Sequence, residues 1–299
     1  MSAASSPATG FPYGVALVCA LWDFPRSSYY AWQKRLTAAA LPAPPPAKRG
    51  PKTTLADVDL LVLIRQDLAE SPWQGEGHRK VWARLRFVKG LHISRKRVLR
   101  LMRENKLLSP HRWVKLPHEH DGEIVTDRPN IMWGADGSQV LTVDDGKVWI
   151  FTAVEHWSAE CVGHYVCKEG TRFNALQPVS QGLLKHFGSV DKDAGRGLAV
   201  RHDYGSAYTS EHFQNQLRFW GVAPSFAFVG EPQTNGVAER FFRTLKEQIV
   251  YGRIYRNIEE LRQAVDNFVE RYNEEWRIEK NGFLSPNEMR RIHLLKQAA

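Results

Sequence analysis

The pattern of apolar and polar residues changes near residue 130, from helical spacing before it to strand-like runs after it. Residues 11–36 contain two helix-like stretches joined by the break "PRSS", which can cap a helix. Residues 55–109 also place apolar residues at helical spacing, most clearly in "ISRKRVLRLMRE" (93–104). Each region has the outline of a helix-turn-helix unit, although any helical hairpin would give the same pattern.

The helix expected at 93–104 has two unlike faces. We expect Val98, Leu101 and Met102 to face a core, because they recur at helical spacing. The opposite face is basic and could contact DNA phosphates; its residues are Arg95, Lys96, Arg97 and Arg100. The alternative is an ordinary solvated face.

After residue 130 the chain alternates between strand and helix patterns. The turn signal "DDG" predicts a hairpin between the first two strands. The five strands are expected at 131–143, 146–157, 160–168, 197–204 and 222–229, with helices at 172–187, near 210–220 and after 235. A three-stranded meander followed by alternating helix and strand predicts a mixed five-stranded sheet flanked by helices.

These patterns predict a multidomain protein, with an all-α helix-turn-helix N-terminal region followed by an α/β core. The stretch "AAALPAPPPAKRGPKTT" (38–54) has the composition of an extended linker. The expected segments are a helical unit at 1–36, a linker at 37–54, a helix-turn-helix domain at 55–110, a connector at 111–129, the core at 130–255 and a helical extension at 256–299.

The charge of the chain is unevenly distributed. The whole chain carries +9, but residues 1–121 hold 20 Lys and Arg against 9 Asp and Glu. A basic region joined to a nearly neutral one indicates that the first part binds a polyanion. No apolar run reaches the roughly 18 residues of a membrane span, and residues 11–22 lack the flanks of a signal peptide. Three cysteines without a CxxC pair suit a reducing cytoplasm.

Three carboxylates stand out in the strand-rich part. Asp136 lies inside the first strand, where a lone buried charge is costly. Asp203 ends the fourth strand, and the strand ends of an open α/β sheet gather ligands. Glu239 opens the helix after the fifth strand, with 35 residues between it and Asp203. The alternative for Glu239 is an acidic first-turn residue that favours the helix dipole.

This arrangement resembles the DDE transposase and retroviral integrase superfamily. The stretches "HDYGSAYTS" (202–210) and "QTNGVAERFFRTLKE" (233–247) are similar to the second-reading-frame product of a bacterial insertion sequence. The resemblance implies an RNase H-like integrase catalytic core at 130–255. It also implies a DNA transposase that cleaves element ends and transfers strands by 3′-hydroxyl attack.

The resemblance assigns catalysis and metal binding to Asp136, Asp203 and Glu239. Phosphodiester cleavage is served by two divalent cations about 3.5–4 Å apart, and hard oxygen ligands suit Mg²⁺, for which Mn²⁺ can substitute. Lys246 matches a family position that contacts DNA near the cleaved end. Arg243 lies with Glu239 and Lys246 on one helix face, and Phe242, Leu245 and Ile249 are expected to face the core. Salt bridges within the helix are the alternative for the two cations.

The implied partners are double-stranded DNA, at element ends and at the target, and further copies of the chain assembled on DNA. A first-frame DNA-binding protein is a further candidate, as a fusion or as a partner, and no membrane is involved. The implied localisation is the bacterial cytoplasm. Two other functions stay open, namely a non-catalytic DNA-binding regulator and an RNase H-type nuclease. A regulator would not need the three carboxylates, and the nuclease would leave the helix-turn-helix region unexplained.

Overall fold

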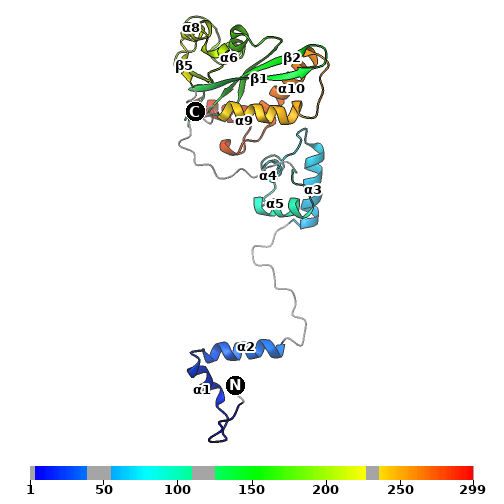
Figure 1. Ribbon diagram of the computed structural model, residues 1–299, viewed down its shortest axis with the longest axis vertical. Coiled ribbons are helices and arrows are strands. Elements are labelled where there is room, and N and C mark those ends of the chain that lie inside the picture. The colour runs from blue at the N-terminus through cyan, green and yellow to red at the C-terminus, as the bar shows by residue number, and fades with distance from the viewer. Residues whose placement is uncertain (1–3, 39–54, 110–124, 227–235, 299) are drawn as a thin grey trace. The chain divides into compact units, whose positions relative to one another are not determined.

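The structure is a computed structural model that describes residues 4–38, 55–109, 125–226 and 236–298 (Figure 1). Two compact units are present, Met1–Thr54 and Leu55–Ala299. Residues 37 and 38 of the predicted linker (37–54) belong to the helix Arg26–Ala38, and its residues 39–54, most of the connector and residues 227–235 lie outside the described residues. No helix within the described ranges is long and apolar enough to cross a membrane.

The first unit contains the two expected helices, α1 (Gly14–Leu21) and α2 (Arg26–Ala38). Cys19 is its one buried hydrophobic residue among those described. Large apolar side chains of both helices are exposed, including Leu21 and Trp32. A helical hairpin of this size cannot bury a core of its own.

The second unit begins with a helical domain built on α3 (Asp57–Glu70), α4 (His78–Ala83) and α5 (Arg95–Glu104). The π-helical turn η1 (Arg84–Val88) extends α4. The side chain of Ser94 caps α5 by accepting a hydrogen bond from the Arg97 backbone N–H. Val98, Leu101 and Met102 are buried with residues of α3 and α4, which confirms the predicted core face of α5.

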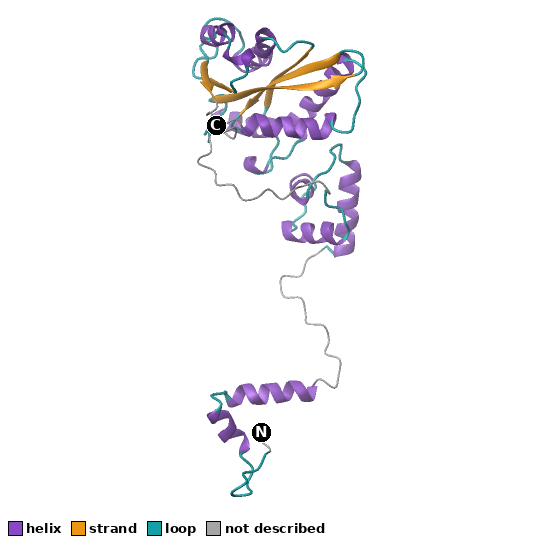
Figure 2. Ribbon diagram, in the orientation of Figure 1, coloured by secondary structure: helices purple, strands orange, loops and turns teal. Residues whose placement is uncertain are grey.

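A mixed five-stranded sheet follows, in the order β3-β2-β1-β4-β5. β1 (Met132–Thr142), β2 (Gly146–Glu155) and β3 (Cys161–Cys167) form the antiparallel meander, and β4 (Ala199–His202) and β5 (Ala223–Phe226) run parallel to β1 (Figure 2). This sheet confirms the predicted RNase H-like fold class. β4 is shorter than the expected 197–204, so Asp203 lies just beyond its strand.

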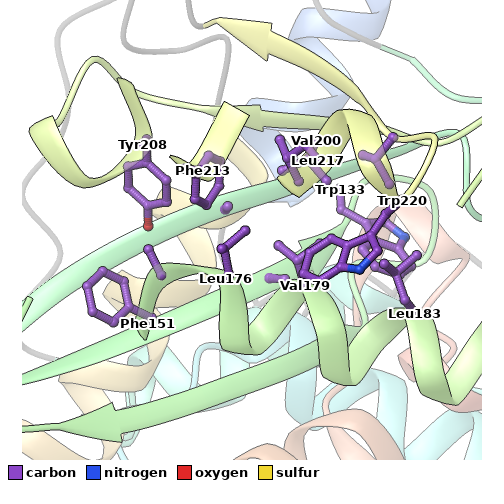
Figure 3. Close-up of a cluster of buried hydrophobic side chains, with 14 of the residues drawn as sticks. Trp133, Phe151, Leu176, Val179, Leu183, Val200, Tyr208, Phe213, Leu217 and Trp220 are labelled. Carbon is purple, nitrogen blue, oxygen red and sulfur yellow. The ribbon is translucent and has the colours of Figure 1, made fainter. Parts of the chain in front are cut away.

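Helices cover both faces of this sheet (Figure 1). On one face α6 (Arg172–Phe187), α7 (Ser206–Thr209) and α8 (Glu211–Phe219) enclose a cluster that includes Trp133, Phe151, Tyr208 and Phe213 (Figure 3). Gly163 lets α6 approach β3 closely, since a Cβ there would lie 2.0 Å from the Pro178 carbonyl oxygen.

The opposite face is covered by α9 (Gly236–Leu245) with its π-helical extension η3 (Lys246–Val250), and by α10 (Ile258–Glu275). Phe242, Leu245 and Ile249 are buried here, as the helical spacing predicts. Odd-numbered residues of β1 such as Trp133 and Ala135 belong to the α6 side, and Val140 belongs to the α9 side. Because side chains alternate along a strand, Asp136 points to the α9 side.

The chain ends in a short 3₁₀ turn, η4 (Glu279–Asn281), and α11 (Pro286–Ala298). The helical domain contacts this region and α10 directly. Trp73 packs edge-to-face on Trp276, with ring centroids 4.9 Å apart. The side-chain amide of Gln248 exchanges two 2.9 Å hydrogen bonds with the backbone of Gln74. The helix-turn-helix domain and the helix that carries Glu239 therefore share a polar link through η3.

Candidate active site

Asp136 lies in the middle of β1 and is only partly accessible to solvent. Its Oδ1 accepts a 2.7 Å hydrogen bond from the backbone N–H of Gly137. The residue directly opposite on β2 is Thr152. The carboxyl group thus stands on the sheet face that α9 covers, in a largely desolvated place.

Asp203 reaches the same region from the neighbouring strand. β4 is parallel to β1, with Gly134 opposite Arg201, so continuation of this register brings Asp203 level with Asp136. Asp203 is exposed, and its Oδ1 accepts a 2.9 Å hydrogen bond from the Gly205 N–H, which fixes the turn after the strand.

Glu239 lies in the first turn of α9 and is exposed. The three carboxyl groups are coupled electrostatically at Asp136. Burial raises the pKa of Asp136 to about 7, the Gly137 N–H opposes that rise, and the charges of Asp203 and Glu239 add to it. The charge of Lys246 acts in the opposite direction. Two of the carboxylates that the sequence singled out therefore contribute to the raised pKa of the third.

No group of three His, Cys, Asp or Glu side chains in the described ranges is close enough together to hold a metal ion. The donor set is nevertheless one that hard cations prefer, since it consists of carboxylate oxygens alone. Like charges brought together disfavour ionisation, and a divalent cation removes that penalty.

The basic residues of α9 and η3 lie beyond the carboxylates. Arg243 is exposed on α9, and Lys246 is the first residue of η3 and is half-buried. π-helical turns inside helices frequently mark functional positions. Lys246 is the basic residue whose charge acts on Asp136, so it belongs to the same electrostatic group as the three carboxylates.

The four basic residues of α5 differ in their surroundings. Arg97 is turned inward, where Nε donates to Asp57 at 2.7 Å and Nη2 donates to the Leu55 carbonyl at 2.6 Å. Arg100 pairs with the same Asp57 at 2.6 Å. Arg95 pairs with Glu279 at 3.0 Å, whereas Lys96 is exposed. The contacts of Arg97 stabilise the domain itself, so its expected role at phosphates is the least supported of the four.

Sequence reasoning overlooked two hydroxyl groups beside Asp136. Thr152 Oγ1 and Tyr208 Oη are both buried and have no hydrogen-bond partner in the part of the chain that the structure describes. Tyr208 lies on the α6 side, with its ring near those of Phe151 and Phe213 (Figure 3). Its hydroxyl is 3.5 Å from where a Gly137 Cβ would stand. A Thr in a strand gives no sequence signal beyond strand propensity, which explains why it was missed.

His202, whose role the sequence left open, is buried and makes two polar contacts. It is fully buried, its Nδ1 lies 2.9 Å from the Asp203 carbonyl oxygen and its Nε2 lies 3.1 Å from the Gln214 amide nitrogen. Burial lowers its pKa, so the neutral ring is favoured. These contacts hold the end of β4 in place next to Asp203.

Two family models match the chain. Residues 57–113 match the HTH-like domain, and residues 220–277 match the integrase core domain. The second match includes Glu239, Arg243 and Lys246.

The chain is also similar to transposases. Transposase InsD for insertion element IS2A/D/F/H/I/K of Escherichia coli is 28% identical over 205 residues, which cover 65% of each chain. Transposase InsD for insertion element IS2-9 of Escherichia coli K12 is equally similar, over 65% of this chain and 64% of the relative. The matched region thus spans slightly less than two thirds of these relatives. The resemblance to insertion-sequence transposases expected from the sequence is confirmed.

Solved structures that align with the chain include retroviral integrases. The catalytic core of BIV integrase aligns with a TM-score of 0.41 and 21% identity, over 57% of this chain and 99% of that one. The HTLV-2 integrase catalytic core in complex with magnesium aligns with a TM-score of 0.40 and 16% identity, over 54% of this chain and 96% of that one.

Proposed function

We propose that this protein is the DNA transposase of an insertion sequence, a polynucleotidyl transferase that hydrolyses one strand at an element end. The freed 3′-hydroxyl then attacks another phosphodiester. One observation carries the proposal: the parallel register of β1 and β4 brings Asp136 level with Asp203, and Asp136 points to the sheet face covered by α9, the helix with Glu239 in its first turn. The similarity to insertion-element transposases supports the same activity.

We infer that Asp136, Asp203 and Glu239 are the catalytic residues and hold Mg²⁺, as two ions, with Mn²⁺ as a substitute. Bound there, two divalent cations supply Lewis-acid stabilisation of the developing charge and lower the pKa of the attacking water. The chain's own contribution would be to present Asp136 from β1, Asp203 from the turn after β4 and Glu239 from the first turn of α9 to the cations. The raised pKa of Asp136 fits this role. Without metal, burial and the neighbouring carboxylates disfavour the ionised form of Asp136, and a bound cation would stabilise that form.

The basic side chains divide into two proposed groups of DNA contacts. Lys246 and Arg243 extend the α9 face beyond Glu239 and would contact the strand being cleaved. On α5, exposed Lys96 together with Arg95 and Arg100 would contact phosphates farther along the element end, with Arg97 acting mainly within the domain. This division corresponds to a DNA-binding domain at 55–110 and a catalytic core at 130–255.

We further propose that the partners are element ends, target DNA and additional copies of the chain on DNA, with a first-frame DNA-binding protein as fusion or partner. Joining two ends requires two active sites in one assembly, which supports an oligomer on DNA. The proposed place of action is the bacterial cytoplasm, at nucleoid DNA.

The test is an assay with a labelled DNA duplex that ends in the element's terminal sequence. We expect cleavage and joined products in Mg²⁺ or Mn²⁺, and neither product with a chelator. The Asp136→Asn variant should bind the duplex and form no product. Binding without cleavage by the wild type would favour the regulator, and cleavage confined to RNA–DNA hybrids would favour the nuclease.

A further inference from the structure

Thr152 stands directly across from Asp136 in the antiparallel β1–β2 pair. Side chains of directly opposed residues share one face of a sheet, with Cβ atoms about 4.5–5.5 Å apart. The Thr152 side chain is thus on the α9 side of the sheet, the same side as the Asp136 carboxyl group. Thr152 is 1% exposed, so water has almost no access to it.

The Thr152 hydroxyl has no hydrogen-bond partner in the described part of the chain. A buried polar group left unsatisfied is costly, and native proteins rarely keep one without a reason. Its neighbour on the other side is His164, opposite it on β3. The His164 ring is oriented by Asp266, whose Oδ1 lies 2.7 Å from Nε2. Asp136 is the carboxyl group directly opposite Thr152 that can accept from this hydroxyl.

The Asp136 carboxyl group shows the complementary feature. Its Oδ1 accepts a hydrogen bond from the N–H of the next residue, Gly137, which is a local contact. A carboxylate accepts about four hydrogen bonds or cation contacts in total, so capacity for another donor remains. A metal-ligating carboxylate is commonly held by a second hydrogen bond, which fixes the oxygen that faces the cation.

We propose that Thr152 is a positioning residue for the Asp136 carboxylate: its hydroxyl donates to Asp136 when the site holds its divalent cations and DNA, and thereby orients the ligand oxygen. This inference rests on the proposed function. In the free protein this hydroxyl has no partner among the described residues, so it can donate to Asp136 once cations and DNA are bound. If Thr152 only packed within the sheet, Val could replace it without loss of cation binding or cleavage, because Val is also β-branched.

Two substitutions separate these roles. Thr152→Val keeps the branched shape and removes the hydroxyl, and Thr152→Ser keeps the hydroxyl. We expect Thr152→Val to weaken Mn²⁺ binding, measured by calorimetric titration of the DNA-bound protein, by about 10–100-fold. The Mg²⁺ concentration for half-maximal cleavage should rise to a similar extent. Thr152→Ser should stay within a few-fold of wild type in both measurements.

The thermal stability of the metal-free protein provides an independent readout. Because the hydroxyl has no partner there, Thr152→Val should melt at or above the wild-type temperature. The matched control is Thr142 on β1, whose hydroxyl donates to the Gly146 carbonyl at 3.1 Å. Thr142→Val should melt lower and bind Mn²⁺ normally.

Unchanged Mn²⁺ binding and cleavage in Thr152→Val would overturn this inference while leaving the proposed function intact. Equal losses in Thr152→Val and Thr152→Ser would also overturn it, since the hydroxyl would then not be the cause. A wild-type protein that neither binds cations nor cleaves DNA would overturn the proposed function and this inference together.

Discussion

Glu160 connects three elements through buried charges and offers a quantitative test of the fold. It precedes β3, and its side chain is 1% exposed. It accepts from Lys185 at 2.7 Å and lies 3.2 Å from His186, both on α6. It also pairs with Arg290 of α11, which is itself largely buried. Glu160→Gln removes the negative charge that Lys185, His186 and Arg290 face.

The expected loss follows from the pKa of Glu160. Burial alone would raise this pKa, but the His186 hydrogen bond and the charges of Arg290, His186 and Lys185 outweigh burial and lower it from 4.5 to about 2. A difference of about 2.5 pKa units corresponds to about 3 kcal/mol. Removing one partner of a buried pair typically costs about 3–5 kcal/mol, which agrees.

The lowered pKa of Glu160 also determines how the unfolding free energy changes with pH. A carboxyl group whose pKa is lowered in the folded state stabilises the fold fully above its unfolded pKa, near 4.5. That stabilisation is lost as the pH falls from about 4.5 through about 2. The difference in unfolding free energy between wild type and Glu160→Gln should therefore be largest at pH 7 and shrink in acid.

The assay is urea unfolding of both proteins at several pH values between 7 and 3. Glu274→Gln is the matched control, because Glu274 pairs with Arg291 of α11 at 2.9 Å but both side chains are about half exposed. It should cost less than about 1 kcal/mol. A Glu160→Gln protein within about 0.5 kcal/mol of wild type at pH 7, or a difference that grows in acid, would refute this account of the cluster.

Three further outcomes are expected. Gln248→Ala leaves the Gln74 backbone N–H and C=O without partners and should lower the unfolding free energy by about 1–3 kcal/mol, measured by urea unfolding. Lys96→Gln should fold normally and reduce the slope of log K against log salt for DNA binding by about 1, as for the loss of one phosphate contact. Arg97→Gln should instead lower the melting temperature, since the domain would lose the bonds to Asp57 and Leu55; an unchanged melting temperature would contradict its structural role.

The sequence predicted the sheet well because its signals are local. A turn at "DDG" sets the β1–β2 hairpin, and period-2 alternation sets which side chains face each layer. The core face of α5 was predictable for the same reason, since Val98, Leu101 and Met102 follow helical spacing. The three carboxylates were singled out by residue type, spacing and the family resemblance, and their role as a metal site stays a prediction.

Features that depend on distant parts of the chain were not predictable. Arg97 belongs to the basic face by sequence, but its partner Asp57 lies 40 positions away and draws it inward. Trp73 looks like a surface residue of a small helical domain, yet it packs against Trp276. The proposed role of Thr152 depends on its position opposite Asp136 and on a hydroxyl without a partner among the described residues. Neither feature can be recognised in the local sequence.

The central claim is that Glu239 is a catalytic metal ligand, and cleavage by Glu239→Gln tests it most directly. A first-turn glutamate that only favours the helix dipole contributes about 0.3–1 kcal/mol, so its loss would leave activity nearly intact. A ligand that stabilises transition-state charge is worth several kcal/mol, or about a thousandfold in rate. We predict that Glu239→Gln folds and binds element ends but cleaves them at least about a thousandfold more slowly in Mg²⁺. Glu247 is an exposed residue of η3, the extension of the same helix. The control variant Glu247→Gln should cleave normally. Near-normal cleavage by Glu239→Gln would contradict the catalytic assignment.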